Sequence, residues 1–170
     1  LFAEAEENNL DWNAKNPRWM RWCLCSLCEQ YYHGVVACAL GWACWKTYLG
    51  RPETDQIHGM AKGTLGNGLS SADHHEDALS VQKALLSLHQ RLGASEENIL
   101  LVQGNLACTY SLLGRKVEAL SLRKEVYSGR LKLNGEEHHE TMREAYNYAV
   151  SLFKLERFEE AKSLMHKTTP

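Results

Sequence analysis

Apolar residues recur at helical spacing through the middle of the chain. After residue 97 they fall at i, i+3, i+7, i+8, i+11 and i+14, which places them on one helix face: Ile99, Val102, Leu106, Ala107, Tyr110 and Leu113. Gly114 follows this run, and glycine is a common signal for the end of a helix. A second apolar run ends at Asn134-Gly135. The pattern therefore predicts two helices joined by a tight turn.

This two-helix pattern repeats along the chain. The segment EALSLRK at 118–124 recurs as EAKSLMH at a spacing of 42, and EDALSVQK precedes it at a spacing of 41. Small residues recur too, and we expect them where helices approach most closely: Ala107, Ala119, Ala149 and Ala161. A lone helical hairpin cannot bury both of its apolar faces, so such hairpins stack on their neighbours. The sequence predicts an all-α fold, a superhelical array of αα-hairpins over 56–170, with repeats at 56–93, 97–135 and 139–168.

The first 70 residues are less regular. We expect an acidic helical start and a Trp-bearing loop with Asn16-Pro17 within a Cys-rich segment, 1–34, followed by a buried, apolar connecting helix within 35–55. Four glycines then crowd the first helix of repeat 56–93: Gly59, Gly63, Gly66 and Gly68. Each costs about 1 kcal/mol relative to alanine inside a helix. We therefore expect this helix to be the least stable part of the array.

Composition and charge exclude several classes of function. The net charge of −2 provides no basic field for nucleic acid. The most apolar stretch, 35–45, is shorter than the roughly 20 residues that span a bilayer, so no membrane helix is expected. Nothing indicates secretion, so we expect a cytoplasmic protein whose six cysteines are reduced thiols or metal ligands. No Ser-His-Asp or Cys-His set is present, and we predict that the chain is not an enzyme.

Two local features of the repeats predict helix ends. Ser95 precedes an acidic helix start and is expected to be an N-cap. The pair His138-His139 stands at a turn between repeats, where adjacent residues cannot face one ion from one helix face. We interpret these histidines as surface turn residues or helix caps.

The repeated motif resembles the kinesin-light-chain type of tetratricopeptide repeat. The segment NLACTYSLLGRKVEAL, followed by LNGEEHHET, carries the resemblance, which extends over about residues 56–168. It implies that the first helices of the repeats line a concave groove for a peptide or partner protein. In that family an Asn of the motif can bond the backbone of an extended peptide, and the matching positions are Asn105 and Asn147. The alternative is that both amides are satisfied within their own hairpin, and Thr64 replaces the Asn in the first repeat.

The Cys-rich segment resembles the closing end of a RING-CH zinc finger, on the residues Trp22, Cys25, Cys28, Gln30, Tyr32 and Gly34. This resemblance implies a truncated finger in which Cys25 and Cys28 are the last pair of zinc ligands, with the others upstream of Leu1. The chain would then be the substrate-binding part of a RING-CH-type E3 ubiquitin ligase, and zinc would bind if the finger were completed. One pair supplies two of the four ligands of tetrahedral zinc, so small apolar thiols in a Trp-rich cluster are the alternative, without a cofactor.

Overall fold

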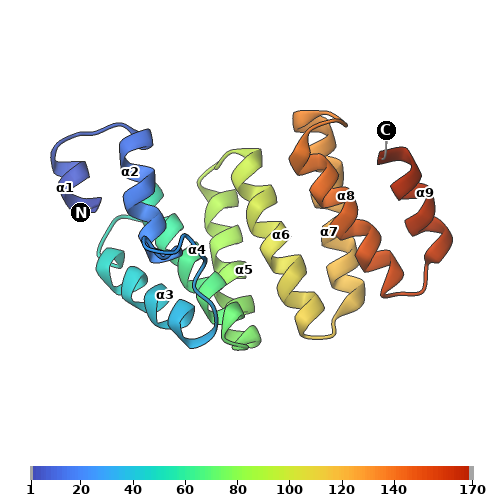
Figure 1. Cartoon of the computed structure of the whole chain (residues 1–170), viewed down its shortest axis with the longest axis horizontal. Helices are drawn as coiled ribbons and strands as arrows, with labels where there is room; N and C mark the ends of the chain where they lie inside the picture. The colour runs from blue at the N-terminus through green and yellow to red at the C-terminus, as the bar shows by residue number, and fades with distance from the viewer. Residues whose placement is uncertain (1, 169–170) are drawn as a thin grey trace. The chain divides into compact units, whose positions relative to one another are not determined.

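The computed structural model describes residues 2–168, and within them the chain is all-α, as predicted. Nine α-helices and one 3₁₀ helix follow in order (Figure 1): α1 Phe2–Glu7, α2 Trp12–Trp19, η1 Met20–Trp22, α3 Gly34–Tyr48, α4 Gln56–Ser71, α5 His75–Arg91, α6 Glu96–Leu112, α7 Lys116–Asn134, α8 His139–Phe153 and α9 Phe158–Thr168. Over the same residues, β pairing is limited to an isolated bridge between Leu24 and Tyr31. None of the described helices is long and apolar enough to cross a membrane.

The chain divides into two compact units. Unit 1 extends to His74 and contains α1 to α4, and unit 2 begins at His75 and contains α5 to α9. The sequence segment 56–93 is therefore divided between the units, with α4 in the first and α5 in the second. Its assignment as one repeat stays a prediction, as do the other predicted domain bounds.

Unit 1 is organised around a close contact between α3 and α4. A Cβ atom at Gly68 would lie 2.5 Å from the carbonyl oxygen of Ala37, and one at Gly41 would lie 3.1 Å from Leu65 Cα. Only glycine lets two backbones approach this closely. The glycine-rich stretch thus forms a 16-residue helix with a packing role, while its predicted weakness stays a prediction.

Aromatic rings from three segments fill the rest of the core of unit 1. Trp19 lies 5.3 Å from Phe2 and 5.5 Å from Tyr48 between ring centroids. The predicted loop at Asn16-Pro17 was wrong, because α2 includes both residues. Pro17 has no N–H to donate to the Asn13 carbonyl, so α2 lacks one helical hydrogen bond. The Asp11 N-cap and the burial of Trp19 offset this loss.

The apolar helix predicted within 35–55 is present as α3, but it is buried on one face only. Gly41, Cys44 and Tyr48 are buried, whereas Val35 is 78% exposed and Trp42 is exposed as well. The prediction of a buried helix was wrong here. A helix that is apolar on every side does not show from its sequence which face packs against another helix.

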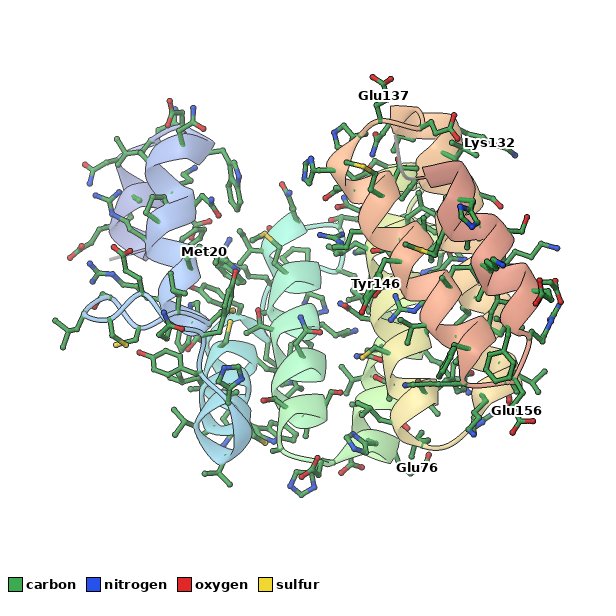
Figure 2. All side chains as sticks on the ribbon, turned by 45° about the vertical axis from the view of Figure 1, so that its right-hand side comes forward. Met20, Glu76, Lys132, Glu137, Tyr146 and Glu156 are labelled. Atoms are coloured by element: carbon green, nitrogen blue, oxygen red, sulfur yellow. The ribbon has the colours of Figure 1, made fainter. Side chains whose placement is uncertain are left out.

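Unit 2 follows the repeat pattern closely. Gly114 and Gly135 end α6 and α7 with φ values of +75° and +83°, the left-handed conformation that favours glycine. Ser95 Oγ accepts from the Asn98 N–H at 3.3 Å, and His138 Nδ1 accepts from the Glu140 N–H at 3.2 Å, so both predicted caps are confirmed. The four recurring alanines are buried. Side chains fill the spaces between neighbouring helices of the unit (Figure 2).

Candidate binding groove

Helices α6, α7 and α8 line an open cavity of about 310 Å³, and both predicted asparagines are among the lining residues. Asn105 comes from α6 and Asn147 from α8. The structure thus brings together two residues that the sequence separates by 42 positions. Thr64, at the matching position of the first predicted repeat, belongs to unit 1, where it is buried and donates to the Met60 carbonyl at 3.0 Å.

Asn147 belongs to a hydrogen-bonded network on the buried side of α8. Its Nδ2 donates to Glu144 Oε2 at 3.2 Å, and Arg123 Nη1 donates to the same oxygen at 3.2 Å. Arg143 Nε donates to Glu144 Oε1, also at 3.2 Å. The amide nitrogen is therefore satisfied inside the hairpin, whereas the Asn147 side-chain oxygen has no hydrogen-bond partner among the described residues.

Asn105 is half-buried on α6 and its side-chain amide bonds to no other described residue. Its backbone bonds within α6, and its carbonyl oxygen lies 3.2 Å from Thr109 Oγ1. A primary amide presents two donors and an acceptor. Asn105 can thus give both kinds of hydrogen bond to a molecule in the cavity.

Arg130 of α7 also lines the cavity and is only 3% exposed. Its Nη1 forms an ion pair with Glu140 Oε2 at 2.7 Å and lies 3.9 Å from Glu97 Oε1. Neither contact has the geometry of a hydrogen bond. Its Nε has no hydrogen-bond partner within residues 2–168. A buried, unpaired donor is costly, so Arg130 is a polar group that the described fold leaves incompletely satisfied.

The charges around the cavity are nearly balanced. Its lining residues Arg123, Arg130 and Arg143 pair with Glu140 and Glu144, and Glu97 lies nearby. The cavity therefore has no strong preference for a ligand of one charge and instead presents fixed hydrogen-bonding groups.

Sequence reasoning missed this ion-pair network. The available signal was Glu144, which falls on the same face of α8 as the buried Thr141, Ala145 and Leu152. A carboxylate on a buried stripe needs a partner. Two of its partners, Arg143 and Asn147, lie on α8 itself, but Arg123 lies on α7, and the pattern of α8 alone could not identify it.

The predicted metal pair, Cys25 and Cys28, lies in a tight turn of unit 1. Cys25 N–H donates to the Gln30 carbonyl at 2.9 Å, and Tyr32 N–H donates to the Cys23 carbonyl at 2.8 Å. The backbone N–H groups of Cys28 and Leu27 point at the Cys25 sulfur and lower its pKa to about 7. By contrast, burial raises the pKa of Cys23, whose thiol bonds to Thr64.

The turn supplies two thiols and no more. Among the described residues, no group of three or more His, Cys, Asp and Glu side chains could hold a metal ion. Tetrahedral zinc requires four ligands. Within residues 2–168, Cys25 and Cys28 are thus not joined by two further side chains that would complete such a site, and zinc binding stays a prediction.

Comparisons with known proteins concern the repeats. Residues 100–140 match the model of the tetratricopeptide repeat family. No curated protein matches the chain. Among solved structures, the nearly identical TPR-like repeats of a Podosopora anserina protein named after kinesin light chain align over 78% of this chain and 64% of theirs, with 15% identity and a TM-score of 0.70.

Two further structures share the fold. A Rap protein complexed with Competence and Sporulation Factor aligns over 78% of this chain and 36% of its own, with 14% identity and a TM-score of 0.68. BtubC (BKLC) from P. vanneervenii aligns over 78% of this chain and 52% of its own, with 14% identity and a TM-score of 0.64. The chain thus spans between about a third and two thirds of these structures. It has the αα-hairpin fold of tetratricopeptide-like repeat proteins, with a tetratricopeptide repeat at residues 100–140.

Proposed function

We propose that unit 2 binds an extended segment of a peptide or partner protein in the α6–α8 groove, and that the chain acts as a non-enzymatic scaffold. The observation that carries the proposal is the position of Asn105 and Asn147 on one open cavity. Repeats of this type generally serve protein–protein interaction, which supports a protein or peptide partner rather than nucleic acid. A cytoplasmic location stays a prediction.

The groups that line the cavity suit a peptide backbone. An extended peptide offers alternating N–H and C=O groups. The Asn105 amide can pair with both, and the Asn147 side-chain oxygen can accept from an N–H, because Glu144 already holds the Asn147 nitrogen. Such main-chain contacts give affinity with little dependence on the peptide's sequence.

The test is selection from a displayed library of random linear peptides on the immobilised chain, followed by affinity measurement for the selected peptides. The double variant Asn105→Ala/Asn147→Ala should weaken binding about 10- to 100-fold, because each lost hydrogen bond contributes about 1 kcal/mol and leaves a peptide group unpaired.

Asn98→Ala is the matched control, since Asn98 is exposed on α6 and does not line the cavity. This control should bind the selected peptides as the unaltered chain does. Equal affinity for the double variant, or the absence of any selected peptide, would exclude the groove as the binding site.

The alternative function, the substrate-binding part of a RING-CH-type ubiquitin ligase, is favoured by the turn that joins Cys25 and Cys28. It requires zinc ligands that this chain does not supply among its described residues. Metal analysis of the purified chain separates the two proposals. Stoichiometric zinc that is lost in Cys25→Ser/Cys28→Ser would support the ligase alternative, and a metal-free chain would leave the binding scaffold.

A further inference from the structure

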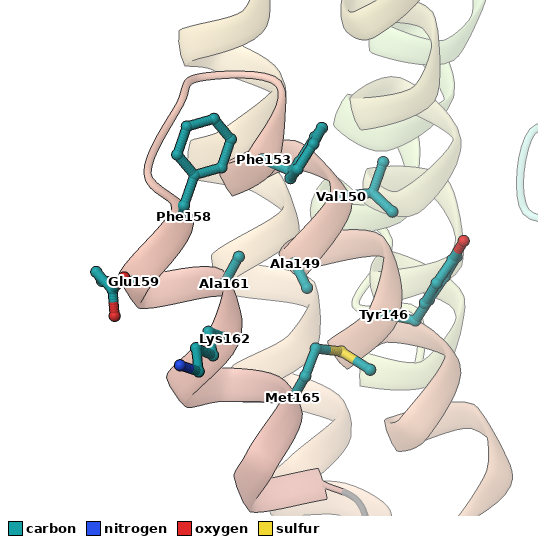
Figure 3. A pocket seen from close by; sticks show the side chains of 9 residues that line it. All are labelled: Tyr146, Ala149, Val150, Phe153, Phe158, Glu159, Ala161, Lys162 and Met165. Atoms are coloured by element: carbon teal, nitrogen blue, oxygen red, sulfur yellow. The ribbon is translucent and has the colours of Figure 1, made fainter.

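Reactive side chains are concentrated in unit 1 rather than in the cavities of unit 2. The cavity of about 430 Å³ between α8 and α9, for example, is lined mainly by apolar side chains, among them Tyr146, Phe153 and Met165 (Figure 3). Five of the six cysteines lie in unit 1: Cys23, Cys25, Cys28, Cys38 and Cys44. Their surroundings decide which of these thiols can react together.

Cys25 and Cys28 lie in one tight turn. The turn is closed by a hydrogen bond from the Glu29 N–H to the Cys25 carbonyl at 2.9 Å, and it is flanked by the isolated bridge between Leu24 and Tyr31. The Cα atoms of residues three apart in such a turn are within about 7 Å of each other, which is the upper limit that a disulfide can join. The backbone thus already holds the two cysteines at a distance that a disulfide requires.

The side chains of the two cysteines also meet. The Cys25 sulfur accepts hydrogen bonds from the backbone N–H groups of Leu27 and Cys28 and from the Cys28 thiol. Donors of this kind stabilise a thiolate at Cys25, and the thiolate is the form of cysteine that attacks a disulfide. The Cys28 thiol therefore lies beside the sulfur atom on which it would act in a second step.

The turn is open to solvent, unlike two of the neighbouring thiols. Cys28 is exposed and Cys25 is partly exposed, and Leu27 between them is 95% exposed. Cys44, by contrast, is fully buried, and Cys23 is half-buried. A small molecule in solution can therefore reach the Cys25–Cys28 turn without any movement of the core of unit 1.

We propose that Cys25 and Cys28 form a reversible dithiol–disulfide pair that reacts with small disulfides, such as oxidised glutathione. The Cys25 thiolate attacks one sulfur of the small disulfide, so that a mixed disulfide forms and one small thiolate leaves. The Cys28 thiol then gives its proton to that thiolate. Its sulfur attacks Cys25, which forms the Cys25–Cys28 bond and releases the second small thiolate. The pair loses two electrons, and the small disulfide gains them.

The position of the pair favours a transient disulfide over a structural one. An exposed disulfide is open to attack by thiols, and disulfides that form in reducing compartments are commonly redox-sensing or catalytic. A single exposed thiol such as Cys108 can proceed only to a mixed disulfide. Zinc binds thiolates, so oxidation of Cys25 and Cys28 and zinc binding by them exclude each other. Oxidation would thus decide whether this turn can act as a metal ligand.

The test is peptide mass spectrometry of the folded chain after equilibration with defined ratios of oxidised and reduced glutathione, in the presence of a metal chelator. Oxidation should remove two hydrogens from the segment that contains Cys25 and Cys28 without adding glutathione, and an excess of reduced glutathione should reverse the loss. Cys28→Ser should instead accumulate glutathione on Cys25, because the second thiol is missing. Cys108→Ser is the matched control, since it removes an exposed thiol outside the turn, and it should leave oxidation of the pair unchanged.

Two results on the unaltered chain would overturn the proposal without any variant. One is a pair that stays reduced, or takes up glutathione on both cysteines, under conditions that modify Cys108. The other is a Cys25–Cys28 disulfide that reduced glutathione cannot open. Unchanged tryptophan emission would show that Cys28→Ser remains folded. The groove proposal is judged separately, because Asn105→Ala/Asn147→Ala alters unit 2 and should leave this oxidation unchanged.

Discussion

The two units pack their helices by different physical means. In unit 1, α3 and α4 approach so closely that Gly68 lies against the backbone of Ala37. In unit 2, side chains remain between the helices, and the α7–α8 contact includes the ion pair of half-buried Arg123 with buried Glu144. Even at Gly129 of α7, an added Cβ would meet the flexible end of the Leu100 side chain rather than a backbone.

This difference explains why the candidate groove lies in unit 2. Side chains that hold helices apart leave room for a cavity. The hydrogen bond to Glu144 also fixes the orientation of the Asn147 side chain that lines this cavity. A backbone-to-backbone contact leaves no such groups available. The packing of unit 1 therefore depends on a close fit between two backbones, and the packing of unit 2 depends on paired polar side chains.

The largest contrast between the units concerns their thiols. Cys44 is fully buried in unit 1, and burial raises its pKa to about 12, whereas Cys108 is exposed on α6. At pH 7 iodoacetamide should therefore alkylate Cys108 at least about a hundredfold faster than Cys44, since the thiolate is the nucleophile. Peptide mass spectrometry gives both rates in one sample. Similar rates would mean that unit 1 does not close around Cys44.

Cys25 should show its own pH dependence in the same experiment. Its pKa is lowered to about 7, so its thiolate is largely formed above that pH and is protonated below it. Its alkylation rate should reach half its maximum near pH 7 and level above about pH 8, while Cys44 remains unreactive across the same range. A rate that still rises steeply above pH 8 would contradict the hydrogen bonds assigned to its sulfur.

The second prediction tests the close contact in unit 1. Gly68→Ala should lower the free energy of unfolding of unit 1 by about 2–3 kcal/mol, because a backbone atom cannot move aside as a side chain can. Tryptophan emission follows this unit alone, since all five tryptophans lie within it: Trp12, Trp19, Trp22, Trp42 and Trp45. Urea unfolding followed by tryptophan emission measures the loss.

Gly104→Ala is the matched control in unit 2. Gly104 is inside α6 with no atom within 4 Å of an added Cβ. The substitution should stabilise the helix by about 0.5–1 kcal/mol and leave the tryptophan transition unchanged. Equal effects of the two substitutions would remove the distinction between the two packing modes.

The third prediction tests the polar network of unit 2. Glu144→Ala leaves Arg123 and Arg143 without this carboxylate and should destabilise unit 2 by about 2 kcal/mol. The change should appear in circular dichroism, which follows all helices, and not in tryptophan emission. Glu144→Gln keeps the shape and one acceptor, so its effect should be smaller. A shift of the tryptophan transition would show that the network also supports unit 1.

The sequence predicted the parts of the fold that depend on local signals. The helices α6 to α9 follow from the 42-residue period, and the ends at Ser95, Gly114, Gly135 and His138 follow from cap and stop residues. The asparagine positions came from a motif resemblance, and the structure places both on one cavity.

The sequence could not predict features that depend on contacts between distant segments. Pro17 indicated a loop, whereas α2 is capped by Asp11 and is held in place by the packing of Trp19 against aromatic rings of distant segments. The glycines of α4 predicted an unstable helix, because helical propensity alone does not show that α3 packs against them. Sequence reasoning did not single out Arg130, whose burial depends on contacts with α8.

The smallest predicted effect concerns a neutral pair that sequence reasoning also missed. Thr109 Oγ1 donates to Gln82 Oε1 at 2.8 Å between α6 and α5, and both residues are buried. Thr109→Val keeps the shape and leaves a buried amide oxygen unpaired, which should cost about 1–2 kcal/mol in unit 2. Gln82→Leu in the same chain removes that unpaired oxygen, so the double variant should recover part of the loss. Strict additivity of the two substitutions, measured by urea unfolding in circular dichroism, would contradict the pairing. The recovered energy would measure how far unit 2 depends on matched partners even where no charge is involved.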